Sequence, residues 1–420
     1  SLTSSTDVKN YLGYSDQVTL KFKLANDITL DAGVFVPYVS GYLDATGKTI
    51  TNLTLSQNTS NLGFIGYFNG RTVTTALDRL TMSNASVLGK LNIGTEVGTS
   101  YLRAITNATA AGSVTGSDIT YTPDPGDTVS GSGSNAGYSN VGGVVGLINA
   151  SSSTTNALNL DTSSVTVSGG THVGGIVGRL NTGTLTNSTS SGSVTGTNQV
   201  GGLAGRVYLG AVTGSSSTSA VTGTVNYTGG LVGYLESTSS SLNTSSHTTG
   251  LVKGVSYVGG LIGQSEGVVG VAVVSSTPTY TTFVTSNLEA SGNYVGGLIG
   301  NASSGSVTNS SVSGTVTGVT TSGIQGYGGI YFGGVIGMSS VATSWNKYTG
   351  SLVKGGTDTG GLIGYNAAAV TNSFSTGDVQ SNSSNVGGLV GWTNSTITGT
   401  TATTGSTTYA TGNVTGGDST

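Results

Sequence analysis

The chain has 420 residues and a net charge of −4; only 7% of its residues are charged, 72 are glycine and none is cysteine. The lack of a basic surplus predicts no nucleic-acid partner, and the lack of cysteine excludes disulfides and thiolate metal sites. No apolar run approaches the roughly 20 residues that cross a bilayer, so no membrane span is expected in this chain.

Residues 1–110 are predicted to form an N-terminal cap and the first, degenerate coils of a repeat structure. About half of the charged residues lie before residue 104, and the charge-rich segment 1–23 is suited to covering an open end of such a structure. Short apolar segments bounded by turn residues, which are typical of β-strands, follow in KFKLANDITL (21–30), GYLDATGKTITNLTL (41–55), NLGFIGYFNGRTV (61–73) and LTMSNASVLG (80–89).

Residues 111–420 repeat one glycine-rich hexad, V-G-G-L-V-G in its most regular form. The first glycines of the repeated pairs are Gly142, Gly174, Gly201, Gly229, Gly259, Gly296, Gly333, Gly360 and Gly387. They are spaced by 32, 27, 28, 30, 37, 37, 27 and 27 residues. A minimum near 27 with occasional additions is the signature of a repeat array with loop insertions. We expect one continuous solenoid from which segments 117–139, 273–285 and 318–330 protrude.

Each repeat contains three short apolar segments. In the repeat that begins at Thr359 these segments are GLIG, AVTNSF and DVQ, separated by Gly, Ser, Thr and Asn. Three strands per coil of about 27 residues predict an all-β chain, a right-handed parallel β-helix with loop insertions. Helical periodicity is nowhere sustained, and the density of Gly, Ser and Thr disfavours helices.

Three residue types recur at fixed offsets within the repeat. The glycine pairs are expected to turn a corner tightly or to admit a neighbouring coil wall. An asparagine that follows the first glycine by 12–14 residues predicts a left-handed turn and a ladder of stacked amides; it occurs at Asn156, Asn187, Asn243, Asn309 and Asn372. A tyrosine two residues before the first glycine predicts an aromatic ladder, which either stabilises the sheet or faces sugars or a second subunit; it occurs at Tyr227, Tyr257, Tyr294 and Tyr331.

V-G-G-L-V-G followed by T-N-S and a short S-V-T-G strand resembles the GLUG repeat of bacterial and archaeal surface proteins. The order of the N-terminal segments, in which D-x-x-G-x-T-I-x-N-L precedes a degenerate hexad, is similar to the opening of GLUG-type β-helices. The resemblance therefore covers almost the whole chain. It implies a β-helix that serves as a stalk or adhesive module, and it implies no particular activity.

Patterns that would indicate catalysis or metal binding are sparse. Asp124 and Asp127 are the closest acidic pair outside the N-terminal region, and their turn-rich context favours a solvated turn over a catalytic or calcium site. His172 and His247 are the candidates for a base near neutral pH, and they fall in different parts of different coils. We therefore expect no enzymatic activity, no cofactor and no metal site.

The leading interpretation is a non-enzymatic, extracellular structural or adhesive β-solenoid of a cell-surface fibre, layer or adhesin that self-assembles. The first alternative is a polysaccharide-acting β-helix enzyme. The second is an ice-binding solenoid, which requires threonine at one offset in every coil. Expected partners are further copies of the chain, neighbouring surface proteins or glycans. The C-terminal segment 406–420, which continues the repeat's chemistry, is predicted to pair with another subunit or coil.

Overall fold

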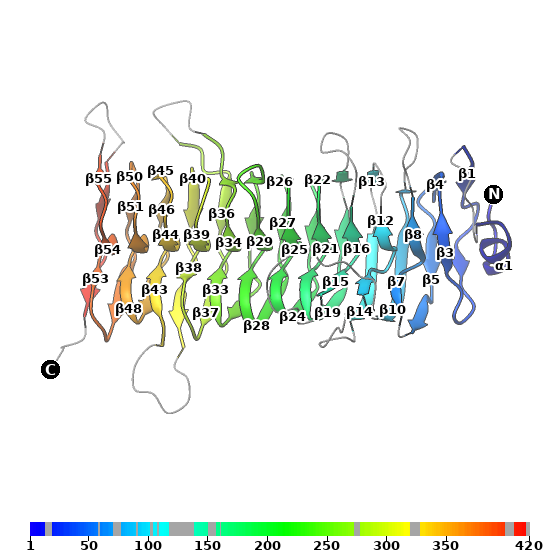
Figure 1. Ribbon diagram of the computed structural model, residues 1–420, viewed down its shortest axis with the longest axis horizontal. Helices are drawn as coiled ribbons and strands as arrows, with labels where there is room; N and C mark the ends of the chain where they lie inside the picture. The colour runs from blue at the N-terminus through cyan, green and yellow to red at the C-terminus, as the bar shows by residue number, and fades with distance from the viewer. Residues whose placement is uncertain are drawn as a thin grey trace, which may run out of the picture.

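The chain forms an elongated stack of parallel β-coils in the computed structural model, with its first and last strands at opposite ends (Figure 1). The structure describes residues 1–12, 19–57, 59–69, 77–89, 91–100, 104–106, 109–116, 138–149, 157–159, 161–272, 278–319, 328–399 and 407–416. The all-β parallel solenoid predicted from the repeat is confirmed. Helix within the described ranges is confined to α1 (Ser5–Asp7) and η1 (Val8–Leu12), too short to cross a membrane.

The described residues form three sheets that run along the stack. The 12-stranded sheet consists of β3 (Val36–Val39), β8 (Ile65–Phe68), β12 (Val97–Ser100), β16 (Val145–Ile148), β21 (Val177–Leu180), β25 (Ala204–Val207), β29 (Val232–Leu235), β34 (Ile262–Ser265), β39 (Ile299–Ala302), β44 (Ile336–Ser339), β49 (Ile363–Asn366) and β54 (Val390–Thr393). The 13-stranded sheet consists of β1 (Lys21–Lys23), β4 (Tyr42–Asp44), β9 (Leu77–Asp78), β13 (Ala104–Thr106), β17 (Ala157–Asn159), β22 (Gly183–Thr186), β26 (Gly210–Thr213), β30 (Ser241–Asn243), β35 (Val268–Val269), β40 (Ser306–Thr308), β45 (Thr343–Ser344), β50 (Val370–Thr371) and β55 (Ile397–Thr398).

The third sheet has 32 strands arranged as three adjoining strips. The first strip holds β2 (Ile28–Thr29), β5 (Thr49–Thr51), β10 (Thr81–Gly89), β14 (Thr109–Gly116), β18 (Thr162–Ser163), β23 (Thr189–Ser190), β27 (Ser216–Ser217), β31 (Ser246–His247), β36 (Thr282–Val284), β41 (Ser310–Val312), β46 (Lys347–Tyr348), β51 (Phe374–Ser375) and β56 (Tyr409–Ala410). The second strip holds β6 (Thr54–Ser56), β19 (Thr166–Ser168), β24 (Ser193–Gly201), β28 (Ala220–Gly229), β32 (Val252–Gly254), β37 (Leu288–Ala290), β42 (Val316–Gly318), β47 (Leu352–Gly355), β52 (Asp378–Ser381) and β57 (Val414–Thr415). The third strip holds β7 (Ser60–Leu62), β11 (Leu91–Ile93), β15 (Tyr138–Gly142), β20 (Thr171–Gly174), β33 (Ser256–Gly259), β38 (Val295–Gly296), β43 (Ile330–Gly333), β48 (Thr357–Gly360) and β53 (Val386–Gly387).

A coil therefore has five strand positions, not the three that the apolar segments predicted. One coil runs through β20, β21, β22, β23 and β24 and then enters the next. The glycine pair, Gly174 and Gly175, lies at the corner where β20 ends and the chain turns toward β21. Asn187, which has a left-handed φ of 50°, separates β22 from β23. Both corners interrupt segments that appear continuous in sequence.

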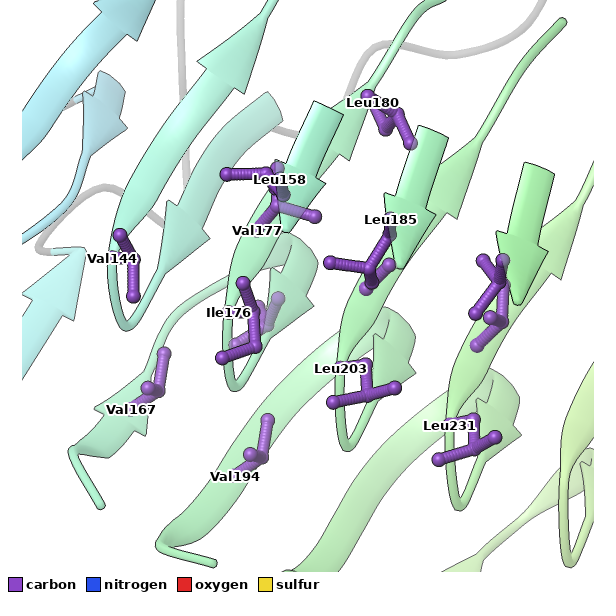
Figure 2. Packing of buried hydrophobic residues seen from close by; sticks show 14 of the residues in the cluster. Val144, Leu158, Val167, Ile176, Val177, Leu180, Leu185, Val194, Leu203 and Leu231 are labelled. Carbon is purple, nitrogen blue, oxygen red and sulfur yellow. The ribbon is translucent and has the colours of Figure 1, made fainter. Parts of the chain in front are cut away.

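The interior is filled by columns of like apolar residues, one from each coil. The fourth hexad residue contributes Val144, Ile176, Leu203 and Leu231, all 0% exposed, which lie one behind another along the rod (Figure 2). Leu158 and Leu185, which pair in the 13-stranded sheet, are also 0% exposed and extend the same packing (Figure 2). Removing these side chains from water is the main stabilising contribution, about 1.5–3 kcal/mol for each.

The nine glycines lie in one column, because each pairs with the next in register. A Cβ added at Gly142 would approach the carbonyl oxygen of Val145 closer than 3.0 Å, and the same holds for the carbonyl three residues after each of the others. None of these nine glycines has a positive φ. Close approach of two walls, and not an unusual backbone angle, is therefore what excludes a side chain here.

The stack continues across position 110, where the sequence suggested a boundary. β14 spans that position and pairs with β10 on one side and with β18 and β19 on the other. At the N-terminal end η1 buries Val8 and Leu12 completely. At the other end β56 and β57 pair with β51 and β52 of the same chain.

The predicted protrusions are only partly within the described residues. Residues 117–137, 273–277 and 320–327 lie outside them. Thr282–Val284, at the end of the second segment, was wrongly assigned to a loop, because it forms β36 and pairs with β31 and β41.

Candidate functional site

The residue before the first hexad position forms a column of left-handed backbone conformations. We name it the left-handed column, and the register places these residues one above another: Asn61, Asn92, Asn140, His172, Gln199, Tyr227, Tyr257, Tyr294, Tyr331, Asp358 and Asn385. All have φ between 33° and 66°. Non-glycine residues rarely adopt this conformation, so contacts along the column must hold it in place.

Amide hydrogen bonds link the N-terminal part of the left-handed column. Asn92 donates from Nδ2 to Asn61 Oδ1 at 2.9 Å, and Asn140 donates in the same way to Asn92 at 2.7 Å. Nδ1 of His172 lies 2.7 Å from Asn140 Oδ1. Burial, followed by the charges of Arg179 and Arg206, lowers the pKa of His172 well below its ordinary value. His172 is 0% exposed, so its ring is part of the buried hydrogen-bonded ladder and is not presented to solvent.

The four predicted tyrosines continue this column as a stack of rings. The ring centroids of Tyr227 and Tyr257 are 4.9 Å apart, those of Tyr257 and Tyr294 4.4 Å, and those of Tyr294 and Tyr331 5.2 Å. All four side chains are half-buried. Burial, followed by the charge of Tyr294, raises the pKa of Tyr257 to about 12.

Three further rings extend this stack into an aromatic band of seven. The residue after the hexad lies beside the left-handed column and supplies Tyr234, Tyr365 and Trp392. Tyr234 stacks on Tyr227 with centroids 5.6 Å apart, Tyr365 meets Tyr331 edge-on at 5.0 Å, and Trp392 stacks on Tyr365 at 4.7 Å. These three rings were not predicted from the sequence, although an aromatic residue directly follows the hexad in T-G-G-L-V-G-Y, T-G-G-L-I-G-Y and V-G-G-L-V-G-W.

Polar side chains flank the aromatic band. The Tyr234 hydroxyl donates to Glu266 Oε1 at 2.5 Å, and the backbone N–H of Ser237 donates to Glu266 Oε2 at 3.2 Å. Burial, followed by the bond to Glu266, raises the pKa of Tyr234. Asn301 donates to Gln264 Oε1 at 2.9 Å, one coil further along. The wall therefore offers half-exposed rings beside carboxylate and amide groups.

The predicted asparagine ladder is not formed. Asn187, Asn309 and Asn372 do occupy left-handed corner positions, with φ of 50°, 52° and 49°. In the coils between them, however, residues other than asparagine turn the corner, namely Gly214, Thr244, Gly270 and Trp345, so the amides are never adjacent. Asn243 was assigned one residue too early, because it lies in β30 and pairs with Thr213. Asn156 lies outside the described residues.

The register position that follows this corner, at the start of the first strip, forms a buried polar column instead. Its members pair in register and are at most 2% exposed: Ser188, Ser215, Ser245, Thr282, Ser310, Asn346 and Ser373. Backbone N–H groups of one coil donate to the side-chain oxygen of the next, as from Ser310 to Asn346 at 3.1 Å and from Asn346 to Ser373 at 3.0 Å. These polar groups hold the coils together.

His247, Glu96 and Asp161 are groups with acid–base chemistry that lie buried within the stack. His247 is 0% exposed, its Nδ1 lies 2.6 Å from Ser286 Oγ, and burial lowers its pKa to about 4. Glu96 occupies the hexad position that Val144 fills in the next coil, and burial, followed by the charge of Asp161, raises its pKa well above the ordinary value. Glu96 and Asp161 are both 0% exposed. Asp124 and Asp127 lie outside the described residues.

The chain matches a known repeat motif and is similar to two known proteins. The model of the GLUG motif matches residues 169–195, 291–317 and 355–380. Halomucin from Haloquadratum walsbyi is 38% identical over 80 residues, 19% of this chain, and the matched segment spans 1% of halomucin's own length. The crystal structure of a candidate immunoglobulin A1 protease from Bacteroides ovatus aligns with a TM-score of 0.46 at 20% identity, covering 59% of this chain and 74% of that one. The chain is a parallel β-solenoid that carries GLUG repeats.

Proposed function

We propose that this chain is a non-enzymatic structural or adhesive segment of a cell-surface protein. The chain forms a rigid rod that presents its outer walls to the surroundings, and it associates with further copies of itself or with neighbouring surface components. The observation that carries the proposal is that chemically active side chains join one coil to the next. Nδ1 of His172 lies 2.7 Å from Asn140 Oδ1, the Ser215 hydroxyl accepts from the backbone N–H of Ser188, and Tyr257 stacks on Tyr294. The GLUG repeats and the halomucin match support a surface role.

The location is tested on intact cells of the source organism. Brief protease treatment should release peptides of this chain while a cytoplasmic marker stays intact. Release only after lysis would contradict the surface role.

The non-enzymatic part of the proposal is tested on the purified chain. Incubation with a panel of acidic and neutral polysaccharides should produce no new reducing or unsaturated ends. Measurable turnover would favour the polysaccharide-acting alternative. Association is tested separately by sedimentation over a range of concentrations, where a strictly monomeric chain would contradict self-assembly.

The ice-binding alternative requires uniform threonine columns. One outward column does contain Thr186, Thr213, Thr308 and Thr371, but Asn243, Gly270 and Ser344 interrupt it. This column does not present the regular flat array that the alternative needs.

A further inference from the structure

Tyr257 and Tyr294 are the most closely stacked pair in the aromatic band. Their ring centroids are 4.4 Å apart and their planes differ by 15°, whereas the other contacts in the band span 4.7–5.6 Å. Both side chains are half-buried, so a small oxidant reaches the rings from solvent.

The backbone holds these two rings in register. Tyr257 N–H donates to the Asn293 carbonyl at 2.9 Å, and Val258 N–H donates to the Tyr294 carbonyl at 2.9 Å. The next residues, Val258 and Val295, are paired and fully buried. A reaction between the rings is therefore intramolecular, and fixed proximity raises its rate far above that of a chance encounter between molecules.

We propose that Tyr257 and Tyr294 form a site of oxidative coupling, at which a one-electron oxidant joins the two phenols as dityrosine. Each phenol loses one electron and one proton, and the two phenoxyl radicals form one bond between their ortho carbons. The two ortho hydrogens then leave carbon as the rings regain aromaticity and the hydroxyls are restored. Two electrons and two protons are released in total, which a peroxidase uses to reduce one hydrogen peroxide to two waters.

The product is a covalent link between neighbouring coils. It joins positions 37 residues apart (294 minus 257) in a chain that has no cysteine with which to form a disulfide. The coupling chemistry goes beyond the proposed surface role and does not depend on it, since the ring geometry belongs to the folded chain itself.

The test oxidises the purified full chain at low concentration with horseradish peroxidase and limiting hydrogen peroxide. Monomer is isolated by size exclusion, which removes products joined between molecules through the exposed Tyr11. Cleavage after glutamate places Tyr257 on peptide 237–266 and Tyr294 on a peptide that begins at Ala290. The expected product is this peptide pair minus two hydrogen atoms, with the link located at Tyr257 and Tyr294 by fragmentation.

Two phenylalanine variants make the test specific. Tyr294→Phe keeps the stacked ring and removes its hydroxyl group, and it should lower the intramolecular dityrosine yield at least about fivefold. Tyr257→Phe removes the other hydroxyl group and should lower the yield by the same factor. Tyr67→Phe is the matched control, because Tyr38 and Tyr67 also stack, with centroids 5.7 Å apart, outside the band; it should leave the yield unchanged. The absence of an intramolecular link in folded wild-type chain, or a dominant Tyr38–Tyr67 product, would overturn the proposal.

Discussion

The backbone N–H of Ser188 donates to the hydroxyl of Ser215 in the next coil at 3.1 Å, and that hydroxyl donates to the carbonyl of Thr213 at 3.1 Å. One side chain thus satisfies a backbone donor of the preceding coil and a carbonyl at its own corner. The arrangement recurs at Ser245, whose hydroxyl accepts from Ser215 N–H and donates to the Asn243 carbonyl. Stacking therefore depends on buried hydroxyls as well as on apolar columns.

Replacing Ser215 with alanine should destabilise the stack. The N–H of Ser188 is buried and would lose its side-chain acceptor, which costs about 1–3 kcal/mol. Urea unfolding followed by circular dichroism measures the change. The adjacent, half-buried Ser216 is the control, and Ser216→Ala should stay within about 0.5 kcal/mol. Equal losses in both variants would contradict the role assigned to the Ser215 hydroxyl.

Replacing Gly201 with alanine should be more damaging. The added Cβ would lie closer than 3.0 Å to the Ala204 carbonyl oxygen and to the backbone nitrogen of Gly233. Backbone atoms of two coils would have to separate, so we expect a loss of about 3 kcal/mol or more, or no folded protein. Gly416→Ala is the control, because its Cβ meets only Val386 Cγ2, at 4.0 Å. A thermal melt of both variants measures the difference. A similar loss in Gly416→Ala would mean that the chain tolerates alanine poorly at glycine positions in general, and not that the Gly201 contact is special.

Acid should destabilise the fold through its two histidines, both of which are buried. The unfolded chain binds protons at histidine below about pH 6.5, whereas burial lowers the pKa of folded His247 to about 4. Between these values the unfolded state binds more protons, so stability falls as pH decreases. The contribution of His247 reaches about 3 kcal/mol by pH 4. Glutamine does not titrate, so in His247→Gln the midpoint of urea unfolding should depend less on pH between pH 7 and 4 than it does in the wild type. An unchanged dependence on pH would contradict this assignment.

Truncating Leu12 should loosen one end of the rod and leave the middle intact. Leu12 is 0% exposed in η1, and coils in a repeat stack couple mainly to their neighbours. Leu12→Ala removes about 2–5 kcal/mol of local packing. Hydrogen exchange should therefore accelerate in β1 and β2, with no change in β20–β24. Uniform acceleration along the chain would mean that the rod unfolds as one unit.

The hexad period was sufficient to predict which residues share a column. Gly142 and Gly174 pair as the spacing implied, and Tyr257 lies beside Tyr294 although 37 residues separate them. Register follows from sequence here because a one-residue slip would move every buried valine to the outer face. The period near 27 with insertions therefore predicted the parallel solenoid and the tyrosine positions.

The corners were less predictable. Asn243 matches the expected asparagine offset, yet Thr244 holds the left-handed corner conformation with φ of 47°. An offset that varies by two residues cannot locate a corner, since the backbone angle there depends on which carbonyls and hydroxyls meet across coils. The five strand positions per coil were missed for the same reason.

The sequence by itself determined the repeat, the register of its valines and glycines, and the absence of cysteine cross-links. Only the tertiary structure decided what those residues do. It showed that Gly142 is required by the nearby Val145 carbonyl, and that Tyr331 meets Tyr365 from the next coil. The repeat period specifies which residues share a column along the stack. The contacts between neighbouring columns depend instead on how far the chain turns at each corner. That turn is set by packing among coils that are distant in sequence.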